Sequence, residues 1–436
     1  MSQQPEAGTL REWWRPPAAA PAAAAPSHGS LPFRSLMAFT CILLLSPQTL
    51  FPVLAPLRIA LLAAGLAVAS HLYEAFGARR PALVLDRPVV LALALAGWAV
   101  LTTPLSLWPG GSASLLADMY FKALVVFWLL GSVVDTRERL RYACTTFALL
   151  MLPLAVTGVR HYLSGQFIEG AQAVDRIVGF DAPLTQNPND LALMLNLGLP
   201  VTVALLLASP GPLARAALAS GALLGAAAIV LSFSRAGFLS LACTIGAYLS
   251  SLLRRGHWRS LAACAGTGVL ALACLPDGYL ARVATISDIE ADKTRSAQLR
   301  WVDMVEATRL TLDNPVLGVG PGMNALALNE ARGPAWKEVH NAYLQYGVDL
   351  GVPGLALFLA LLLACLRDAR EARRLRLRDP GDRELPLLAE GLQTSLIAFA
   401  VAAFFQPIAY QFYFFLIGGL AVAARRISAA EPERAS

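Results

Sequence analysis

Hydrophobic and polar positions follow one another in long blocks along this chain. Apolar runs close to the ~20 residues that a helix needs to cross a bilayer recur from near residue 34 almost to the end. Short polar stretches separate most of them. The pattern predicts about twelve membrane-spanning helices, at residues 34–51, 54–73, 88–104, 115–134, 141–160, 188–208, 213–232, 235–253, 258–275, 352–368, 385–405 and 407–424.

The composition agrees with this pattern. Of the 436 residues, 56% are hydrophobic and 15% are charged, so we expect an all-α polytopic membrane protein. The six cysteines all lie within apolar runs and are expected to be packing residues, without a disulfide or metal-ligand spacing. Residues 1–30 are rich in Ala and Pro and lack the basic start and compact apolar segment of a signal peptide.

Basic residues orient the predicted spans. With twelve spans, the main arginine groups share one side, which the positive-inside rule places in the cytoplasm together with both termini. These groups are Arg11, Arg15 and Arg34; Arg79 and Arg80; Arg137, Arg139 and Arg141; Arg215; Arg254, Arg255 and Arg259; Arg367 to Arg383; and Arg425 with Arg426. The predicted organisation is a disordered cytoplasmic tail at 1–33, nine spans over 34–275, a long loop on the opposite side of the membrane at 276–340, an interfacial helix with three spans over 341–426, and a cytoplasmic tail at 427–436.

The long outward loop runs into the next span through WKEVHNAYLQYGVDLGVPG, residues 336–354. We predict a short helix that starts near His340 and ends at Gly351, followed by a membrane helix with Pro353 in its first turn. This places an imidazole at the membrane rim, where an ordinary pKa near ~6.5 suits proton transfer. The alternative is an interfacial histidine that only bonds nearby carbonyls.

Several arginines face outward, against the positive-inside rule. Arg176 precedes the sixth span, Arg235 lies in the tight turn between two spans, and Arg300 lies in the long loop. For most outward arginines we expect pairing with acids such as Asp303 or with lipid headgroups. Arg235 is harder to explain in this way, because its short turn must lie at the interface. The guanidinium fork matches phosphate oxygens, so the expected partner of Arg235 is an anionic lipid-linked group. An amphipathic helix over 296–312 is expected to lie along the membrane surface, with Leu299, Val302 and Val305 on one face.

Two further motifs of the long loop have weaker meanings. Residues 318–322 read GVGPG, but no strand precedes them, so a turn with close backbone approach is expected instead of a nucleotide site. Asp288, Glu290 and Asp292 alternate in a way that could hold a divalent cation. Nothing nearby completes the ligand shell, and a solvated acidic stretch is expected. We expect no metal, no cofactor and no nucleic-acid partner.

A histidine at the outer rim, outward arginines and a surface helix together fit one reaction, which is transfer from a lipid diphosphate carrier to a hydroxyl. The base removes the acceptor proton, worth ~10² to 10⁴ in rate, and arginines neutralise the departing diphosphate. A flippase or exporter of lipid-linked glycans is the alternative from another class. It is disfavoured because the spans carry almost no charge near the middle of the bilayer.

The motifs also resemble a known family. Arg235 to Leu239 forms R-x3-L, Arg300 is followed by Trp301 and then by DNPVLGVG at 313–320, and His340 to Gly351 forms H-x10-G. Together they resemble the signature of the O-antigen ligase and polymerase superfamily. The resemblance implies a membrane glycosyltransferase (GT-C-like) fold in the bacterial inner membrane. It also implies a glycan donor on undecaprenyl diphosphate at the periplasmic face, metal-independent transfer and inversion at the anomeric carbon.

By the same resemblance, His340 would be the general base and Arg235 and Arg300 would hold the diphosphate, while Arg176 matches less closely. Gly351 and Leu239 are structural positions of the two motifs. Ligases transfer to lipid A-core, polymerases to the growing glycan, and O-oligosaccharyltransferases to Ser or Thr of a protein. One dominant outward loop and a length of 436 residues favour the ligase. The loop at 161–187 supports the polymerase as the alternative.

Overall fold

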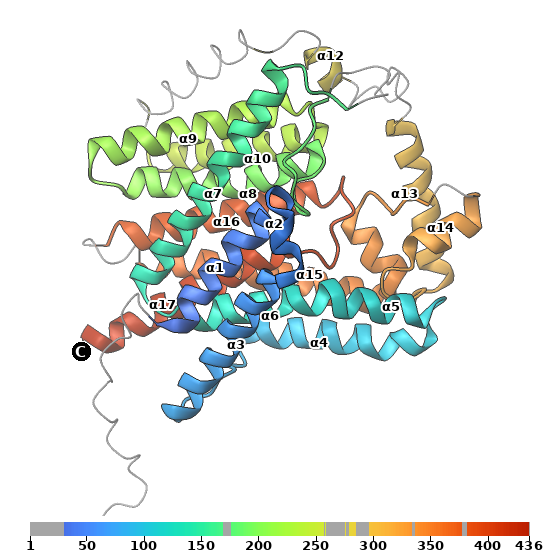
Figure 1. Ribbon diagram of the computed structural model, residues 1–436, viewed down its shortest axis with the longest axis horizontal. Helices are drawn as coiled ribbons and strands as arrows, with labels where there is room; N and C mark the ends of the chain where they lie inside the picture. Colours follow the sequence, from blue (N-terminus) through green and yellow to red (C-terminus); the bar gives the residue numbers. More distant parts are fainter. Residues whose placement is uncertain are drawn as a thin grey trace, which may run out of the picture.

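The computed structural model describes residues 30–168, 176–256, 258, 275, 279–284, 296–333, 336–376 and 382–435. Its long helices lie roughly side by side, and α13 crosses near one end of this bundle (Figure 1). In chain order the helices are α1 (Leu31–Leu45), α2 (Pro47–Leu50), η1 (Pro52–Leu57), α3 (Ile59–Gly77), α4 (Arg87–Thr102), η2 (Thr103–Leu105), α5 (Pro109–Leu115), η3 (Leu116–Tyr120), α6 (Phe121–Val133), α7 (Arg137–Leu163), α8 (Pro188–Ala208), α9 (Pro212–Leu231), α10 (Arg235–Arg254), α12 (Tyr279–Ala284), α13 (Ser296–Asp313), α14 (Asn324–Arg332), α15 (Ala342–Arg376), α16 (Glu384–Ala402) and α17 (Phe412–Ala435).

Within the described ranges, 10 helical stretches are long and apolar enough to cross a membrane. They correspond to ten of the twelve predicted spans, and this fits the prediction of an all-α, multi-pass membrane protein. The first predicted span, 34–51, instead forms α1 of 15 residues, followed by α2 and η1. The ninth, 258–275, lies outside the described residues except at its two ends.

Ion pairs join the arginine-rich ends of the helices. They link the start of α7 to the segment before α16, the residue after α10 to α16, and α17 to the residue before α4. The pairs are Arg137 with Asp382 (2.6 Å), Arg255 with Glu390 (2.5 Å) and Arg426 with Asp86 (2.7 Å). These helix ends therefore gather at one end of the bundle, as the common side of the predicted arginine groups requires. The opposite end carries the candidate site.

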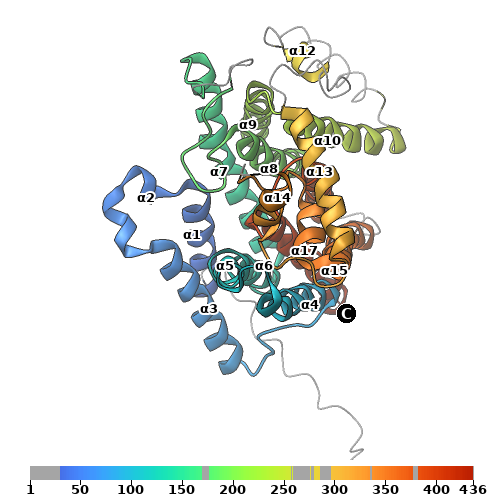
Figure 2. The same ribbon diagram turned by 90° about the vertical axis from the view of Figure 1, so that its right-hand side faces the viewer.

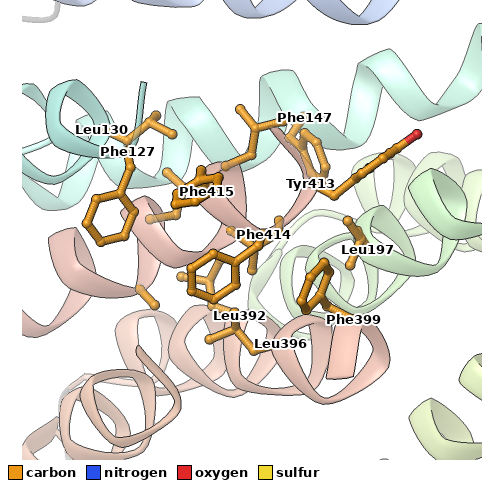
Figure 3. Packing of buried hydrophobic residues seen from close by; sticks show 14 of the residues in the cluster. Phe127, Leu130, Phe147, Leu197, Leu392, Leu396, Phe399, Tyr413, Phe414 and Phe415 are labelled. Carbon is orange, nitrogen blue, oxygen red and sulfur yellow. The ribbon is translucent and has the colours of Figure 1, made fainter. Parts of the chain in front are cut away.

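The core of the bundle surrounds the start of α17 (Figure 3). Phe414 packs against Phe399 of α16 and Phe415 against Phe127 of α6, with ring centroids 5.5 and 6.1 Å apart. Close side-chain packing of this kind is what holds membrane helices together, because lipid provides little hydrophobic driving force. The core fixes where α17 begins, and with it the connection 403–411 that leads from α16 to the candidate site.

Candidate active site

His340 lies between α14 and α15, at the end of the bundle opposite the ion pairs. The next residue, Asn341, caps α15: its Oδ1 accepts hydrogen bonds from the backbone N–H groups of Tyr343 (3.0 Å) and Leu344 (3.1 Å). Such a cap satisfies two amides that have no partner within the helix. The helix thus begins at Ala342, immediately beside the histidine.

The helix that starts beside the histidine is interrupted at Gly351, which has φ 69° and ψ −173°. A side chain at Gly351 would collide with the carbonyl oxygen of Val316, so glycine permits both the positive φ and the close approach. The amide of Val352 donates to the carbonyl of Pro315 at 2.8 Å. The predicted short helix ending at Gly351, with a restart at Pro353, is confirmed.

The His340 imidazole has a defined orientation. Its Nδ1 lies 3.0 Å from the backbone carbonyl oxygen of Glu338. A carbonyl can only accept, so Nδ1 carries the hydrogen and Nε2 keeps its lone pair. Burial, followed by the charge of Arg300, lowers the pKa of His340 to about 4, and Lys337 and Arg332 act in the same direction. The imidazole is therefore neutral at neutral pH, with Nε2 able to accept a proton.

The segment 336–339, which leads to His340, lies along α14. Three hydrogen bonds hold it: from the amide of Trp336 to Asn329 Oδ1 (3.2 Å), from Arg332 Nη2 to the carbonyl of Lys337 (3.1 Å), and from the amide of Val339 to Asn324 Oδ1 (3.0 Å). Arg332 also pairs with the buried Asp303 of α13. The expected pairing of an outward arginine with Asp303 is thereby confirmed. The same ion pair joins α13 to α14.

Asp349, fully buried near the end of the short helix, holds the glycine-containing turn. Its carboxylate accepts from the amide of Gly322 (2.9 Å), the amide of Asn324 (2.8 Å) and Asn324 Nδ2 (3.2 Å). The backbone amide of Val319 donates to the carbonyl of Val348 at 2.8 Å. The run 318–322 is thus a turn in close backbone contact with the helix, as predicted.

A second group forms around Asn189, in the first turn of α8. Its Oδ1 accepts from Arg176 Nη2 (2.7 Å) and from Ser234 Oγ (2.9 Å). Ser234 also caps α10, since its Oγ accepts from the amide of Gly237 at 3.1 Å, and Arg235 is the first residue of that helix. The structure therefore places Arg176 beside the turn that carries Arg235. Two helix N-termini with nearby arginines favour bound anions.

The connection 403–411 contacts the group around Asn189 directly, and it reaches the segment before His340 through Gln345. The hydrogen bonds are from Gln406 Nε2 to the carbonyl of Asn189 (3.3 Å), from the amide of Ala409 to Gln345 Oε1 (3.1 Å), and from Gln345 Nε2 to Glu338 Oε2 (3.2 Å). Sequence reasoning missed Asn189, Gln345 and Gln406. The one available signal was Gln406-Pro407, a polar and helix-breaking pair inside an otherwise apolar stretch.

α13 is the predicted amphipathic helix, and its apolar face points away from the protein. Leu299, Val302 and Val305 are 55%, 54% and 54% exposed, whereas Asp303 and Ala307 are buried against the protein. Turned by 90°, the bundle shows α13 running past α14 toward α15, the two helices against which it packs (Figure 2). This arrangement agrees with a helix whose apolar side faces lipid, and its position along the membrane surface stays a prediction.

The remaining predicted positions are the motif leucine Leu239 and the acidic run of the long loop. Leu239 is half-buried on α10, one turn after Arg235. Asp288, Glu290 and Asp292 lie outside the described residues. Among the residues that the structure does describe, no three His, Cys, Asp or Glu side chains gather in a group that could hold a metal ion.

Comparison with protein families bears on the same part of the chain. Residues 220–359 match the family described as O-antigen ligase, and this match includes Arg235, Arg300 and the segment from His340 to Gly351. Residues 26–166 match a family of unknown function, DUF5935. No curated protein matches the chain. The first match supports assignment of the chain to the O-antigen ligase and polymerase superfamily, and the resemblance seen in its motifs is confirmed.

Proposed function

We propose that the protein is an O-antigen ligase that transfers a glycan from undecaprenyl diphosphate to a hydroxyl of lipid A-core, at the periplasmic face of the bacterial inner membrane. The observation that carries the proposal is the orientation of His340. Its Nδ1 is bonded to the carbonyl of Glu338, which leaves Nε2 as a base, and the charge of Arg300 acts on the same ring.

In the proposed reaction, Nε2 of His340 takes the proton of the acceptor hydroxyl. The oxygen forms a bond to the anomeric carbon while the bond from that carbon to the diphosphate oxygen breaks, and the diphosphate leaves with the electron pair. Attack from the side opposite the leaving group inverts the anomeric centre. Arg300, Arg235 and Arg176, aided by the N-termini of α8 and α10, hold the diphosphate charge. The proposal uses no metal and no cofactor.

The low pKa of the free histidine suits this sequence of events. Arg300, Lys337 and Arg332 all lower the pKa of His340 because they disfavour a second positive charge. A bound diphosphate would offset these cations and raise the pKa of the ring toward its ordinary value. The base would then be neutral before the donor binds and more strongly basic once it has bound.

A polymerase is the second candidate. The observation that favours it is the connection between α7 and α8, which brings Arg176 to Asn189 and gives the site a second outward segment. In that case the acceptor hydroxyl belongs to the growing glycan, whereas a Ser or Thr acceptor would make the protein an O-oligosaccharyltransferase. The chemistry at His340 is the same in all three.

The deciding experiment is transfer by the purified protein in nanodiscs, with undecaprenyl-diphosphate glycan as donor and lipid A-core as acceptor, with and without EDTA. His161→Ala is a matched control for His340→Ala, because His161 also bonds a backbone carbonyl through Nδ1, that of Val178 at 2.7 Å. Product on lipid A-core that survives EDTA, persists in His161→Ala and disappears in His340→Ala is expected.

Each other outcome changes the proposal in a defined way. Longer glycans on the carrier, without product on lipid A-core, would make the protein a polymerase. Loss of product with EDTA would require a metal and return attention to Asp288, Glu290 and Asp292. Product from His340→Ala at the wild-type rate would remove His340 as the base.

A further inference from the structure

We propose that Asp349 and Asn324 are positioning residues for His340, and that they fix the segment ending in the histidine to the short helix before Gly351. The inference rests on the proposed function only in taking His340 as the base. Neither residue is placed to touch a substrate, since Asp349 is fully buried and Asn324 is 1% exposed.

The first support is that every bond in the chain from Asp349 to the histidine is present. The Asp349 carboxylate accepts from the backbone amide and the Nδ2 of Asn324, at 2.8 and 3.2 Å. Asn324 Oδ1 then accepts from the amide of Val339 at 3.0 Å, and Val339 precedes His340. A buried carboxyl group is costly unless it is hydrogen-bonded, and here two of the bonds that satisfy it come from Asn324, which holds the residue before the histidine.

The second support is that Asp349 determines which way the Asn324 amide faces. The oxygens of Asp349 accept from the backbone amides of Gly322 and Asn324, and the Val339 amide can only donate, so the NH₂ group turns toward Asp349 and the oxygen toward Val339. Rotating the amide by half a turn would set oxygen against carboxylate and NH₂ against the Val339 amide, leaving buried groups unsatisfied. The donors around Asp349 and the Val339 amide together therefore fix the Asn324 oxygen as the acceptor for the segment before His340.

The third support is packing around Val339, whose side chain is fully buried. It lies in a small core with Ala307 of α13, Leu328 of α14 and Val348 of α15. Three helices thus meet at the residue before the histidine, and the Asn324 bond sets its backbone direction. A base misplaced by about 1 Å can cost about 10²-fold in rate, so this arrangement has a direct effect on turnover.

The test uses three variants of the full-length protein in nanodiscs: Asn324→Asp, Asp349→Asn and the combination of both. Each single change should lower kcat by about 10- to 100-fold while changing the KM for the lipid-linked donor by less than about twofold, since diphosphate binding is left intact. The combined variant again has one carboxylate and one carboxamide at this pair, and its kcat should exceed that of both single variants. Glu330→Gln, on the exposed side of α14, is the control and should keep wild-type rates.

Two results would overturn the proposal. One is a combined variant whose loss is the product of the two single losses, which would mean that the pair does not act through its mutual bond. The other is a rise in donor KM at unchanged kcat. Failure of the proposed function is recognised separately, because His340→Ala would then retain transfer.

Hydrogen exchange of the wild-type protein decides the structural part even if a variant does not fold. The amide of Val339 should exchange as slowly as the amides of α14, because its acceptor is buried. Exchange at the rate of an open loop would show that the Asn324 bond does not hold the segment, and would overturn the proposal.

Discussion

The two parts of the candidate site are built in different ways. The histidine part comprises the segment 336–340, α14 and Asp349. Its polar groups form hydrogen bonds with one another, between residues that are distant in the sequence. The arginine part comprises Arg176, Asn189 and the turn 234–235, where two spans begin and helix N-termini add positive potential. The first arrangement fixes the direction of one ring, and the second gathers positive charge. The ring is therefore oriented by one part of the fold, and the other part adds positive charge to that of Arg300, Lys337 and Arg332 near the ring.

The largest expected effect separates these two parts. His340→Ala should lower kcat by about 10² to 10⁴ with little change in donor affinity, since the diphosphate contacts are left in place. Arg235→Ala should mainly weaken donor binding, by about 10- to 100-fold, because a hydrogen bond to a charged group contributes roughly 1.5–3 kcal/mol. Steady-state kinetics and a donor-binding titration on both variants measure the two effects independently.

Arg160→Ala is the control for the arginine, because Arg160 is exposed at the end of α7. It should leave donor affinity unchanged. In cells, His340→Ala should let lipid-linked donor accumulate in the outer leaflet, whereas a flippase defect would leave it on the cytoplasmic face. Equal loss of donor binding in His340→Ala and Arg235→Ala would contradict the division between orientation and charge.

The parts of the fold that could be predicted depend on local signals. The helix break at Gly351 follows from a glycine two residues before Pro353, and the position of Arg235 follows from a short polar turn between apolar runs. The first predicted span was wrong in its length, because Ser46 adopts a positive φ and Pro47 and Pro52 each start a new short helix. Hydropathy alone counts these residues as one run.

The bonds that complete the site could not be predicted in the same way. Asn324 and Asp349 are 25 residues apart, and Asn189 meets Gln406 across 217 positions. Nothing local marks an Asp, Asn or Gln as the partner of one distant residue, because the pairing depends on how α8, α15 and the 403–411 connection pack. The match of residue types to chemistry pointed to His340 and the arginines, and tertiary structure supplied the residues that orient them.

A second, smaller effect concerns the pH dependence of kcat/KM. Since burial and Arg300 lower the pKa of His340 to about 4, kcat/KM should rise with pH through the acid limb near that value and then level off. Arg300→Gln removes a nearby positive charge, so protonation of the ring becomes easier and the limb should move to higher pH. Burial persists in the variant, and the limb should stay below the ordinary histidine value of ~6.5.

Arg235→Gln provides the comparison for this measurement, since the cations that lower the pKa of His340 are Arg300, Lys337 and Arg332. It should reduce kcat/KM at every pH without moving the acid limb. The pH–rate profiles are best measured at donor concentrations below KM, where they report the free enzyme. Equal shifts in the two variants would show that both parts act on the ring as one electrostatic unit.

The smallest expected effect concerns the connection 403–411, which contacts both parts. Gln406→Ala removes one long hydrogen bond, to the carbonyl of Asn189 at 3.3 Å, and a bond of this kind contributes about 0.5–1.5 kcal/mol. A change of at most about tenfold in donor affinity follows. Gln345→Ala removes the bonds to Glu338 and Ala409 and should act mainly on kcat, because Glu338 holds the ring.

Gln411→Ala is the matched control for these two variants, since its amide bonds within the same connection, to the carbonyl of Pro407 at 3.1 Å. It should leave both donor affinity and kcat near wild type. The informative result is the direction of the other two changes: affinity for Gln406→Ala and turnover for Gln345→Ala. If both behaved like Gln411→Ala, the connection would be a passive link between α16 and α17, and the two parts of the site would be held in register by the helices alone.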